Sequence, residues 1–191
     1  LDNKGTILES AGSPYIYDNV EIVNEGVWEF VNATNINYGN DSPVVVNTSS
    51  GLFKTIATGT STIGIAFDNQ GGTVEADVGT LALTSGTNTG GTFNAALGAA
   101  VLLAGVYGGT YTGSGAGAVS LNSNILINTG GATFDFSPGL FQWNGSGIDL
   151  DGHVLVNAGE MTWSAPGVLF GNTGIAQNGS GNQGGTLDNQ G

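Results

Sequence analysis

The sequence has no cysteine and almost no positive charge. Only Lys4 and Lys54 are basic, against fifteen acidic residues, which gives 191 residues a formal net charge of −13. Without cysteine the chain has no disulfide, no cysteine-ligated zinc and no thiol nucleophile. A polyanion repels a phosphate backbone and an anionic lipid surface, so we expect no nucleic-acid partner. No run of 18 apolar residues occurs, so we expect no membrane insertion.

Proline and helical patterns are scarce as well. There are 4 prolines beside 35 glycines, and without a Gly-X-Y period this composition excludes collagen. No window of 11 or more residues carries a helical apolar stripe with caps. What recurs is a period-two alternation rich in Val, Ile and Leu, as at 80–83, 125–127 and 154–156. This pattern is typical of short β-strands.

One motif repeats along the chain: an Asn, then one or two Gly, then often Thr and a large apolar residue. It recurs at a mean spacing of about 22 residues, with intervals that range from 18 to 29. A unit of this length cannot bury its own apolar face, whereas stacked coils make a continuous core. We therefore predict an all-β, right-handed parallel β-solenoid of eight to nine coils, one segment over residues 1–191. The handedness follows the crossover rule. A β-sandwich is the alternative, but it would show turn signals every 8–12 residues.

The motif assigns structural roles to its residues. Asn tolerates left-handed backbone, bonds to its own turn and forms ladders when stacked. We predict a ladder of Asn3, Asn24, Asn47, Asn69, Asn128 and Asn157. The apolar residue of each motif should form one core column, made of Ile7, Trp28, Phe53, Val74, Phe93, Tyr111, Phe134, Trp163 and Leu187. Trp143 lies outside the motif, in the long 128–156 coil, and is the candidate for surface contact with a sugar.

The sequence contains weak candidates for a catalytic, a metal and an ice-binding site, and each has a simpler interpretation. Asp149, Asp151 and His153 form the sole acid–histidine cluster, but no Arg accompanies them and both lysines are distant in sequence. We interpret the cluster as a solvated turn and predict no catalytic residue, no metal site and no cofactor. Weak, incidental Ca²⁺ binding by Asp and carbonyl oxygens stays an open alternative. An ice-binding threonine array would need coils of identical length, which the spacings contradict.

Three segments carry a family resemblance. They are Val78-Gly-Thr-Leu-Ala-Leu-Thr-Ser-Gly-Thr-Asn-Thr-Gly-Gly-Thr-Phe93, Phe141-Gln-Trp-Asn-Gly-Ser-Gly-Ile148 and Asn157-Ala-Gly-Glu-Met-Thr-Trp163. They resemble the repeats of bacterial autotransporter passengers and of filamentous-haemagglutinin-like exoproteins. The resemblance covers most of 47–190 and implies an extracellular or cell-surface rod with no catalytic residues. The stretch 8–46, with Tyr15-Ile-Tyr17, departs from the pattern and is a candidate specialised coil.

These observations predict a non-enzymatic rod or fibre segment. The alternative is an adhesin module that binds glycans or host proteins through loops of the 128–156 coil, and a polysaccharide-cleaving β-helix enzyme ranks below both. The segments Leu-Asp-Asn-Lys-Gly at 1–5 and Leu-Asp-Asn-Gln-Gly at 187–191 occupy the same place in the repeat. We therefore expect the chain to pair with itself end to end, or to be part of a longer rod of such coils.

Overall fold

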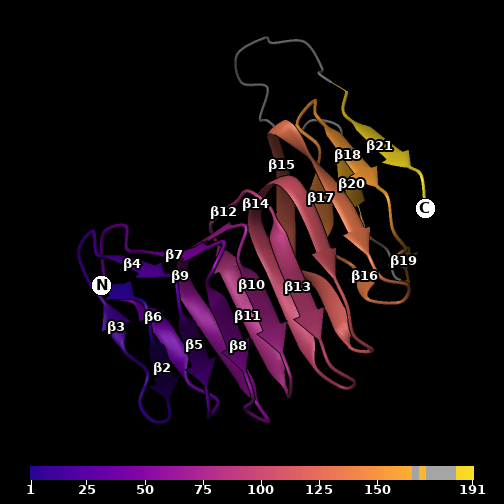
Figure 1. The fold of residues 1–191 in the computed structure, drawn as a ribbon. Coiled ribbons are helices and arrows are strands. Elements are labelled where there is room, and N and C mark those ends of the chain that lie inside the picture. The colour runs from indigo at the N-terminus through magenta and orange to yellow at the C-terminus, as the bar shows by residue number, and fades with distance from the viewer. Residues whose placement is uncertain (165–167, 171–183) are drawn as a thin grey trace.

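The computed structural model describes residues 1–164, 168–170 and 184–191. All regular structure in this part of the chain is β-strand, and the strands stack in parallel as a β-solenoid of about eight turns, about 21 residues apart. Figure 1 shows the N-terminus (indigo) at one end of the stack and the C-terminal strands (yellow) at the other. The prediction of a parallel β-solenoid is therefore confirmed.

Each turn of the chain passes through up to three strand positions, so the strands form three parallel ladders. Face one contains β1 (Asp2–Asn3), β4 (Glu21–Asn24), β7 (Val44–Thr48), β12 (Thr87–Asn88), β17 (Gly147–Asp149) and β20 (Val168–Phe170). Face two contains β2 (Thr6–Glu9), β5 (Val27–Phe30), β8 (Leu52–Thr55), β10 (Thr73–Ala76), β13 (Gly91–Ala95), β18 (Val154–Asn157) and β21 (Thr186–Asn189).

Face three contains β3 (Tyr15–Ile16), β6 (Asn35–Tyr38), β11 (Thr80–Ser85), β16 (Phe141–Trp143) and β19 (Met161–Trp163). Three longer strands, β9 (Thr60–Gln70), β14 (Ala100–Gly113) and β15 (Ala118–Phe136), pass from one face to the next without a break. The same face is therefore built from segments that lie one coil apart in the sequence.

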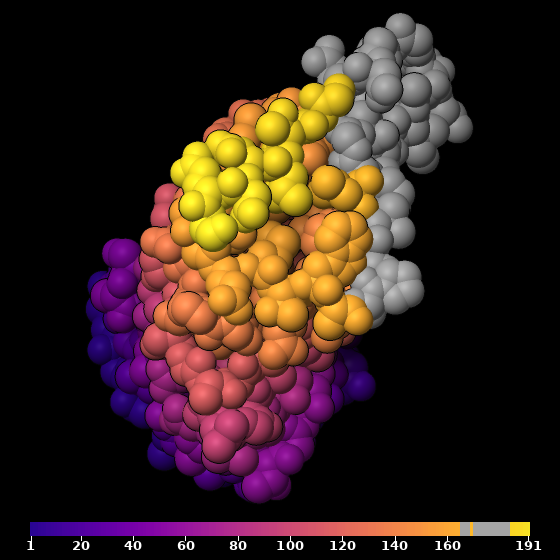
Figure 2. Space-filling model, turned by 90° about the vertical axis from the view of Figure 1, so that its right-hand side faces the viewer, coloured from indigo at the N-terminus to yellow at the C-terminus, as the bar shows by residue number. Residues whose placement is uncertain are grey.

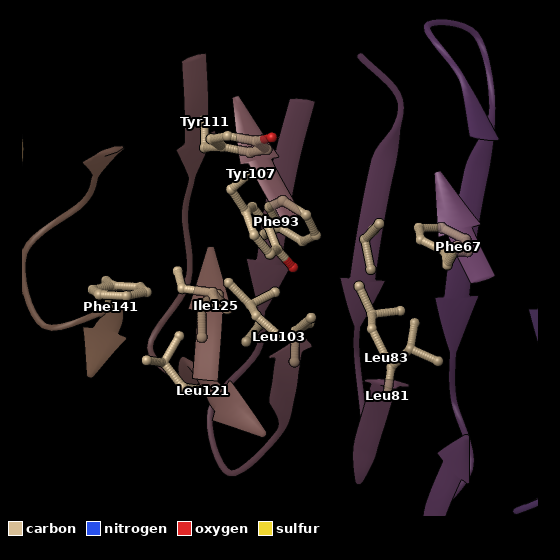
Figure 3. Close-up of a cluster of buried hydrophobic side chains, with 14 of the residues drawn as sticks. Phe67, Leu81, Leu83, Phe93, Leu103, Tyr107, Tyr111, Leu121, Ile125 and Phe141 are labelled. Carbon is tan, nitrogen blue, oxygen red and sulfur yellow. The ribbon is translucent and has the colours of Figure 1, made fainter. Parts of the chain in front are cut away.

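The core follows from the strand alternation. In β9 buried and partly exposed residues alternate along the whole strand, because successive side chains point to opposite sides of a sheet. Figure 3 shows the inward side chains of successive coils, among them Phe67, Phe93 and Tyr111, gathered inside the stack. Phe53 stacks on Trp28 at 5.3 Å between ring centroids and meets Phe67 edge-on at 5.2 Å. Full burial of a side chain such as Phe53 contributes about 1.5–3 kcal/mol, so the axial column is a main source of stability.

The predicted core column holds over its first half. Ile7, Trp28, Phe53, Val74 and Phe93 are direct register partners in successive coils. At the next coil the register moves by two residues, because Gly91, not Phe93, pairs with Tyr111. The rings of Phe93 and Tyr111 still pack at 5.7 Å, so the core is continuous although the register is not.

The last two members of the predicted column are wrong. The register partner of Phe134 in the next coil is Asn157, so the column does not continue to Trp163. Leu187 lies on the same face, but it pairs with Leu155, which is two residues before Asn157. Trp163 lies on face three, paired with Trp143, and is 58% exposed. Register partners across this coil are 22 or 23 residues apart, as in Val119 with Phe141 and Ala132 with Leu155, so the coil is of ordinary length. The 29-residue motif interval arises because the motif at Asn157 lies one strand position further along the coil.

An asparagine ladder runs along the end of face one. Asn3 Nδ2 donates to Asn24 Oδ1 at 2.7 Å, Asn24 Nδ2 to Asn47 Oδ1 at 2.8 Å, and Asn47 Nδ2 to Asn69 Oδ1 at 2.9 Å. All four side chains are buried. The series of side-chain bonds ends at Asn69, whose Nδ2 donates instead to the carbonyls of Gly72 at 3.0 Å and Gly90 at 3.1 Å.

The other two predicted ladder members lie elsewhere. Asn128 lies against Gly108 and its Oδ1 accepts a hydrogen bond from Gly130 N at 3.1 Å. Asn157 is on face two, where its Nδ2 donates to Asn189 Oδ1 at 2.6 Å. Asn157 therefore makes a separate asparagine pair and does not continue the ladder.

The glycines of the motif make room for the ladder. A Cβ on Gly51 would lie 2.2 Å from Asn47 Oδ1, and one on Gly72 would lie 2.3 Å from Asn47 Nδ2. A Cβ on Gly91 would lie 2.2 Å from Asn69 Nδ2. The Asn-then-Gly order of the motif thus reflects a steric requirement, since the side chain amide occupies the space where a Cβ would be.

This requirement predicts the effect of Gly72→Ala. The new methyl group would displace the Asn47 amide from its partners, and we expect a loss of about 3 kcal/mol in the free energy of unfolding, measured by urea denaturation. Gly130→Ala is the matched control, because its Cβ would meet only Asn128 Oδ1 at 3.5 Å. The control should change stability by less than about 0.5 kcal/mol. Equal stabilities for the two variants would contradict the steric account.

Candidate functional site

A surface cleft lies at the corner between faces two and three. It has a volume of about 710 Å³ and includes Thr112, Asp135, Ser137, Pro138 and Glu160 in its lining. Figure 2 views the molecule from the C-terminal side, where residues 186–191 (yellow) lie against the orange residues of the preceding coil. Most of the residues that line the cleft belong to the 128–156 coil and to the coil that follows it.

Local hydrogen bonds fix the shape of this cleft. Ser137 Oγ donates to the carbonyl of Gly113 at 2.8 Å, and Gly139 N donates to Glu160 Oε1 at 2.9 Å. Phe136 is buried beneath the loop and stacks on Phe141 at 5.2 Å. The lining offers carboxylate and hydroxyl groups and no cation, so its chemistry suits a ligand that donates hydrogen bonds.

The residues that line this cleft could not be identified from the sequence. Asp135 and Glu160 are 25 positions apart, and only the coil spacing of the structure brings them to one cleft. The 29-residue interval between motifs indicated an outgrowth in this coil, and that interpretation is wrong, since register partners across the coil are 22 or 23 residues apart.

Trp143 does not have the role that the sequence predicted. Its side chain is fully buried, and its indole Nε1 donates to the carbonyl of Ser146 at 2.5 Å. It stacks on Trp163 with 4.6 Å between ring centroids. The prediction of a surface sugar contact at Trp143 is therefore wrong, because the strand alternation of β16 directs this ring into the core.

The acid–histidine cluster forms a turn. Asp151 N donates to Asp149 Oδ1 at 3.1 Å, and His153 N donates to the carbonyl of Leu150 at 2.7 Å. Asp151 adopts a positive φ of 43°. Asp149, however, is only 9% exposed, so it is not the solvated residue that the sequence indicated. Within 1–164, 168–170 and 184–191, no group of three or more His, Asp and Glu side chains is placed to hold a metal ion.

Both lysines are held by carboxylates. Lys54 Nζ lies 3.3 Å from Glu29 Oε2 and 3.1 Å from Asp77 Oδ2. Burial lowers the pKa of Lys54, but the bonds to Asp77 and Glu29 outweigh burial and raise that pKa above its ordinary value. Lys4 lies 3.4 Å from Asp2 and 3.3 Å from Glu25. The two cations of the chain are thus engaged in ion pairs with its own acids.

Glu9 is a buried carboxyl on the inward side of β2. It is 7% exposed, and Trp28 Nε1 donates to its Oε2 at 3.1 Å. Its Oε1 is buried with no hydrogen-bond partner. Burial raises the pKa of Glu9, and the indole hydrogen bond opposes that rise. The ionised carboxylate therefore weakens the core at neutral pH.

The raised pKa predicts a pH-dependent effect of Glu9→Gln. The folded state holds the proton more tightly than the unfolded state, so wild-type stability falls as the pH rises from the unfolded value, about 4.3, through the folded one. At pH 7 we expect the variant to melt about 2 °C higher, since its amide oxygen can still accept from Trp28. The advantage should vanish near pH 4. Glu21→Gln, which makes the same charge change on an exposed residue, should show no such dependence in melting curves.

The described part of the chain contains no helix long and apolar enough to cross a membrane. No protein-family model, no curated protein and no solved structure matches the sequence.

Proposed function

We propose that this chain is a non-enzymatic structural segment of an extracellular or cell-surface rod, of the kind found in bacterial autotransporter passengers and filamentous-haemagglutinin-like exoproteins. The observation that carries the proposal is the use of the repeated residues. The asparagine, glycine and aromatic positions of the motif serve contacts between coils: Asn24, Asn47 and Asn69 bond to one another, and Trp28 packs on Phe53. A sequence repeated for axial stacking is typical of a rod.

An enzymatic function has less support than a structural one. Hydrolysis of a glycosidic bond by two carboxylates needs them on opposite sides of the scissile bond. Asp149 and Asp151 instead belong to one turn, in which Asp151 N donates to Asp149. We expect no polysaccharide cleavage by the purified chain. Cleavage that Asp149→Asn or Asp151→Asn abolishes would overturn this part of the proposal.

Self-association by coil addition is part of the proposal. Each coil bonds to its neighbours through backbone amides, as where Val27 N donates to the carbonyl of Gly5 at 2.8 Å and Leu52 N to that of Gly26 at 2.8 Å. A further coil, in the same polypeptide or in another copy, can add by the same contacts. Side-by-side association is opposed by the net charge of −13.

This proposal predicts how association depends on concentration and salt. Sedimentation and electron microscopy of the 191-residue chain should show single-file rods that lengthen with concentration. Salt at about 1 M shortens the screening length from about 10 Å to about 3 Å, and should strengthen association by weakening charge repulsion. A species that stays monomeric at every concentration and salt would contradict end-to-end pairing.

The second candidate function is an adhesin module that acts through the 128–156 coil. The 710 Å³ cleft favours it, because Asp135 and Ser137 of that coil line the cleft with Glu160. For this function, Asp135→Asn combined with Glu160→Gln should weaken binding of a glycan or protein ligand about tenfold or more, measured by calorimetry. Binding that survives this double substitution would place the ligand elsewhere.

A further inference from the structure

The tyrosines divide sharply by exposure. Tyr107 and Tyr111 are fully buried, while Tyr15, Tyr17 and Tyr38 are 61%, 54% and 53% exposed. The three exposed tyrosines fall within 24 consecutive residues, in the stretch that departs from the repeat. Large aromatic side chains gathered on a surface mark binding sites, because their exposure to water is unfavourable.

The fold brings these three tyrosines to one place. β3 and β6 are neighbouring parallel strands of face three, and Ile16 of β3 is the register partner of Tyr38. The rings of Tyr15 and Tyr17, on either side of Ile16, are 6.3 Å apart with an angle of 31° between their planes. A Cβ on Gly39, the residue after Tyr38, would lie 2.6 Å from the Tyr17 ring, so the three tyrosines lie at one corner of two adjacent coils, here called the tyrosine patch.

A cleft adjoins the patch at Tyr38. It has a volume of about 240 Å³, and Asp41, Ser42, Pro43 and Ser85 also line it. The Tyr38 hydroxyl donates to the carbonyl of Asp41 at 3.0 Å, which holds the ring against the loop that follows β6. The cleft therefore combines an aromatic wall and a proline with one carboxylate and two serine hydroxyls.

The backbone around the patch is shaped to hold the rings. A Cβ on Gly39 would lie 2.6 Å from Tyr17 Cδ1 and 2.6 Å from the carbonyl of Ile16, so only glycine leaves room for this part of the preceding coil. Asp18 and Asp41 both adopt left-handed backbone, with φ of 58° and 57°. Asp18 N donates to Asn40 Oδ1 at 2.6 Å, which ties the two corner loops together. The patch is thus ordered by contacts within the protein.

We propose that the tyrosine patch and its cleft bind a neutral glycan. The apolar C–H face of a sugar ring packs on an aromatic ring, and its hydroxyls can donate to the Asp41 carboxylate and exchange hydrogen bonds with Ser42 and Ser85. The site does not depend on assembly of the rod, and it lies at a different corner from the cleft of the 128–156 coil.

Charge selects the class of glycan. Asp18 and Asp41 are acidic, and the chain as a whole carries −13. Lys4 and Lys54, its two cations, are paired with carboxylates on other strands. A sulfated, phosphorylated or uronate-containing glycan would find repulsion and no compensating cation. Uncharged hexose or N-acetylhexosamine chains meet neither obstacle.

The experiment measures binding of four probes to the whole chain by calorimetry. The probes are a β-1,4-linked glucose hexamer, an N-acetylglucosamine hexamer, a galacturonate hexamer and a lysine-rich peptide. We expect at least one neutral hexamer to bind and the galacturonate hexamer not to bind. Tyr15→Ala with Tyr17→Ala, and separately Tyr38→Ala, should each weaken that binding about tenfold or more.

Matched variants distinguish the loss of a ring contact from the loss of the fold and from binding at another site. Tyr15→Phe with Tyr17→Phe keeps the rings and should keep affinity within about threefold. Leu97→Ala removes an 84% exposed apolar side chain elsewhere and should have no effect, and all variants should keep the wild-type melting temperature. Failure of both neutral hexamers to bind, binding by the lysine peptide alone, or loss of binding only in the Asp135→Asn, Glu160→Gln protein would each overturn the proposal.

Discussion

Register between neighbouring coils is the constraint on which the rest of this structure depends. Each coil must present its inward side chains directly above those of the coil before, as Phe53 does between Trp28 and Val74. The asparagine ladder enforces this alignment along one corner, since an amide at 2.8 Å from the next leaves little freedom to slip. A shift by one residue would turn every inward side chain outward, so the ladder and the aromatic column support the same arrangement.

The sequence predicts the architecture well because the repeat encodes it. Spacing near 22, the alternation of apolar residues and the Asn–Gly order together specify parallel coils, and the first half of the core column follows directly from them. The second half could not be predicted in this way. Tyr107 takes the place of an asparagine at the end of face one, and the motif at Asn157 lies on face two, in register with Phe134. A motif in a sequence does not state which face it occupies.

The candidate binding surfaces were harder to predict than the core. Trp143 lies outside the motif, which predicts a surface position, but the in–out alternation of its short strand points the side chain into the core. The sequence marks Tyr15 and Tyr17 only as a departure from the pattern, and the register of β3 with β6 brings Tyr38 of the next coil to the same corner. The clefts lie at corners between faces, and the shape of a corner depends on loop backbone that composition does not specify.

The central claim is that successive coils stack in parallel register through the asparagine side chains. Solution NMR of the side-chain amides of Asn24, Asn47 and Asn69 tests it most directly. The account predicts slow hydrogen exchange at these amides and cross-relaxation between residues one coil apart, because all three amides are buried and hydrogen-bonded. Asn24 and Asn47 donate to the next asparagine, and Asn69 donates to the carbonyls of Gly72 and Gly90. Fast exchange of all three amides, or contacts only between residues close in sequence, would contradict the claim.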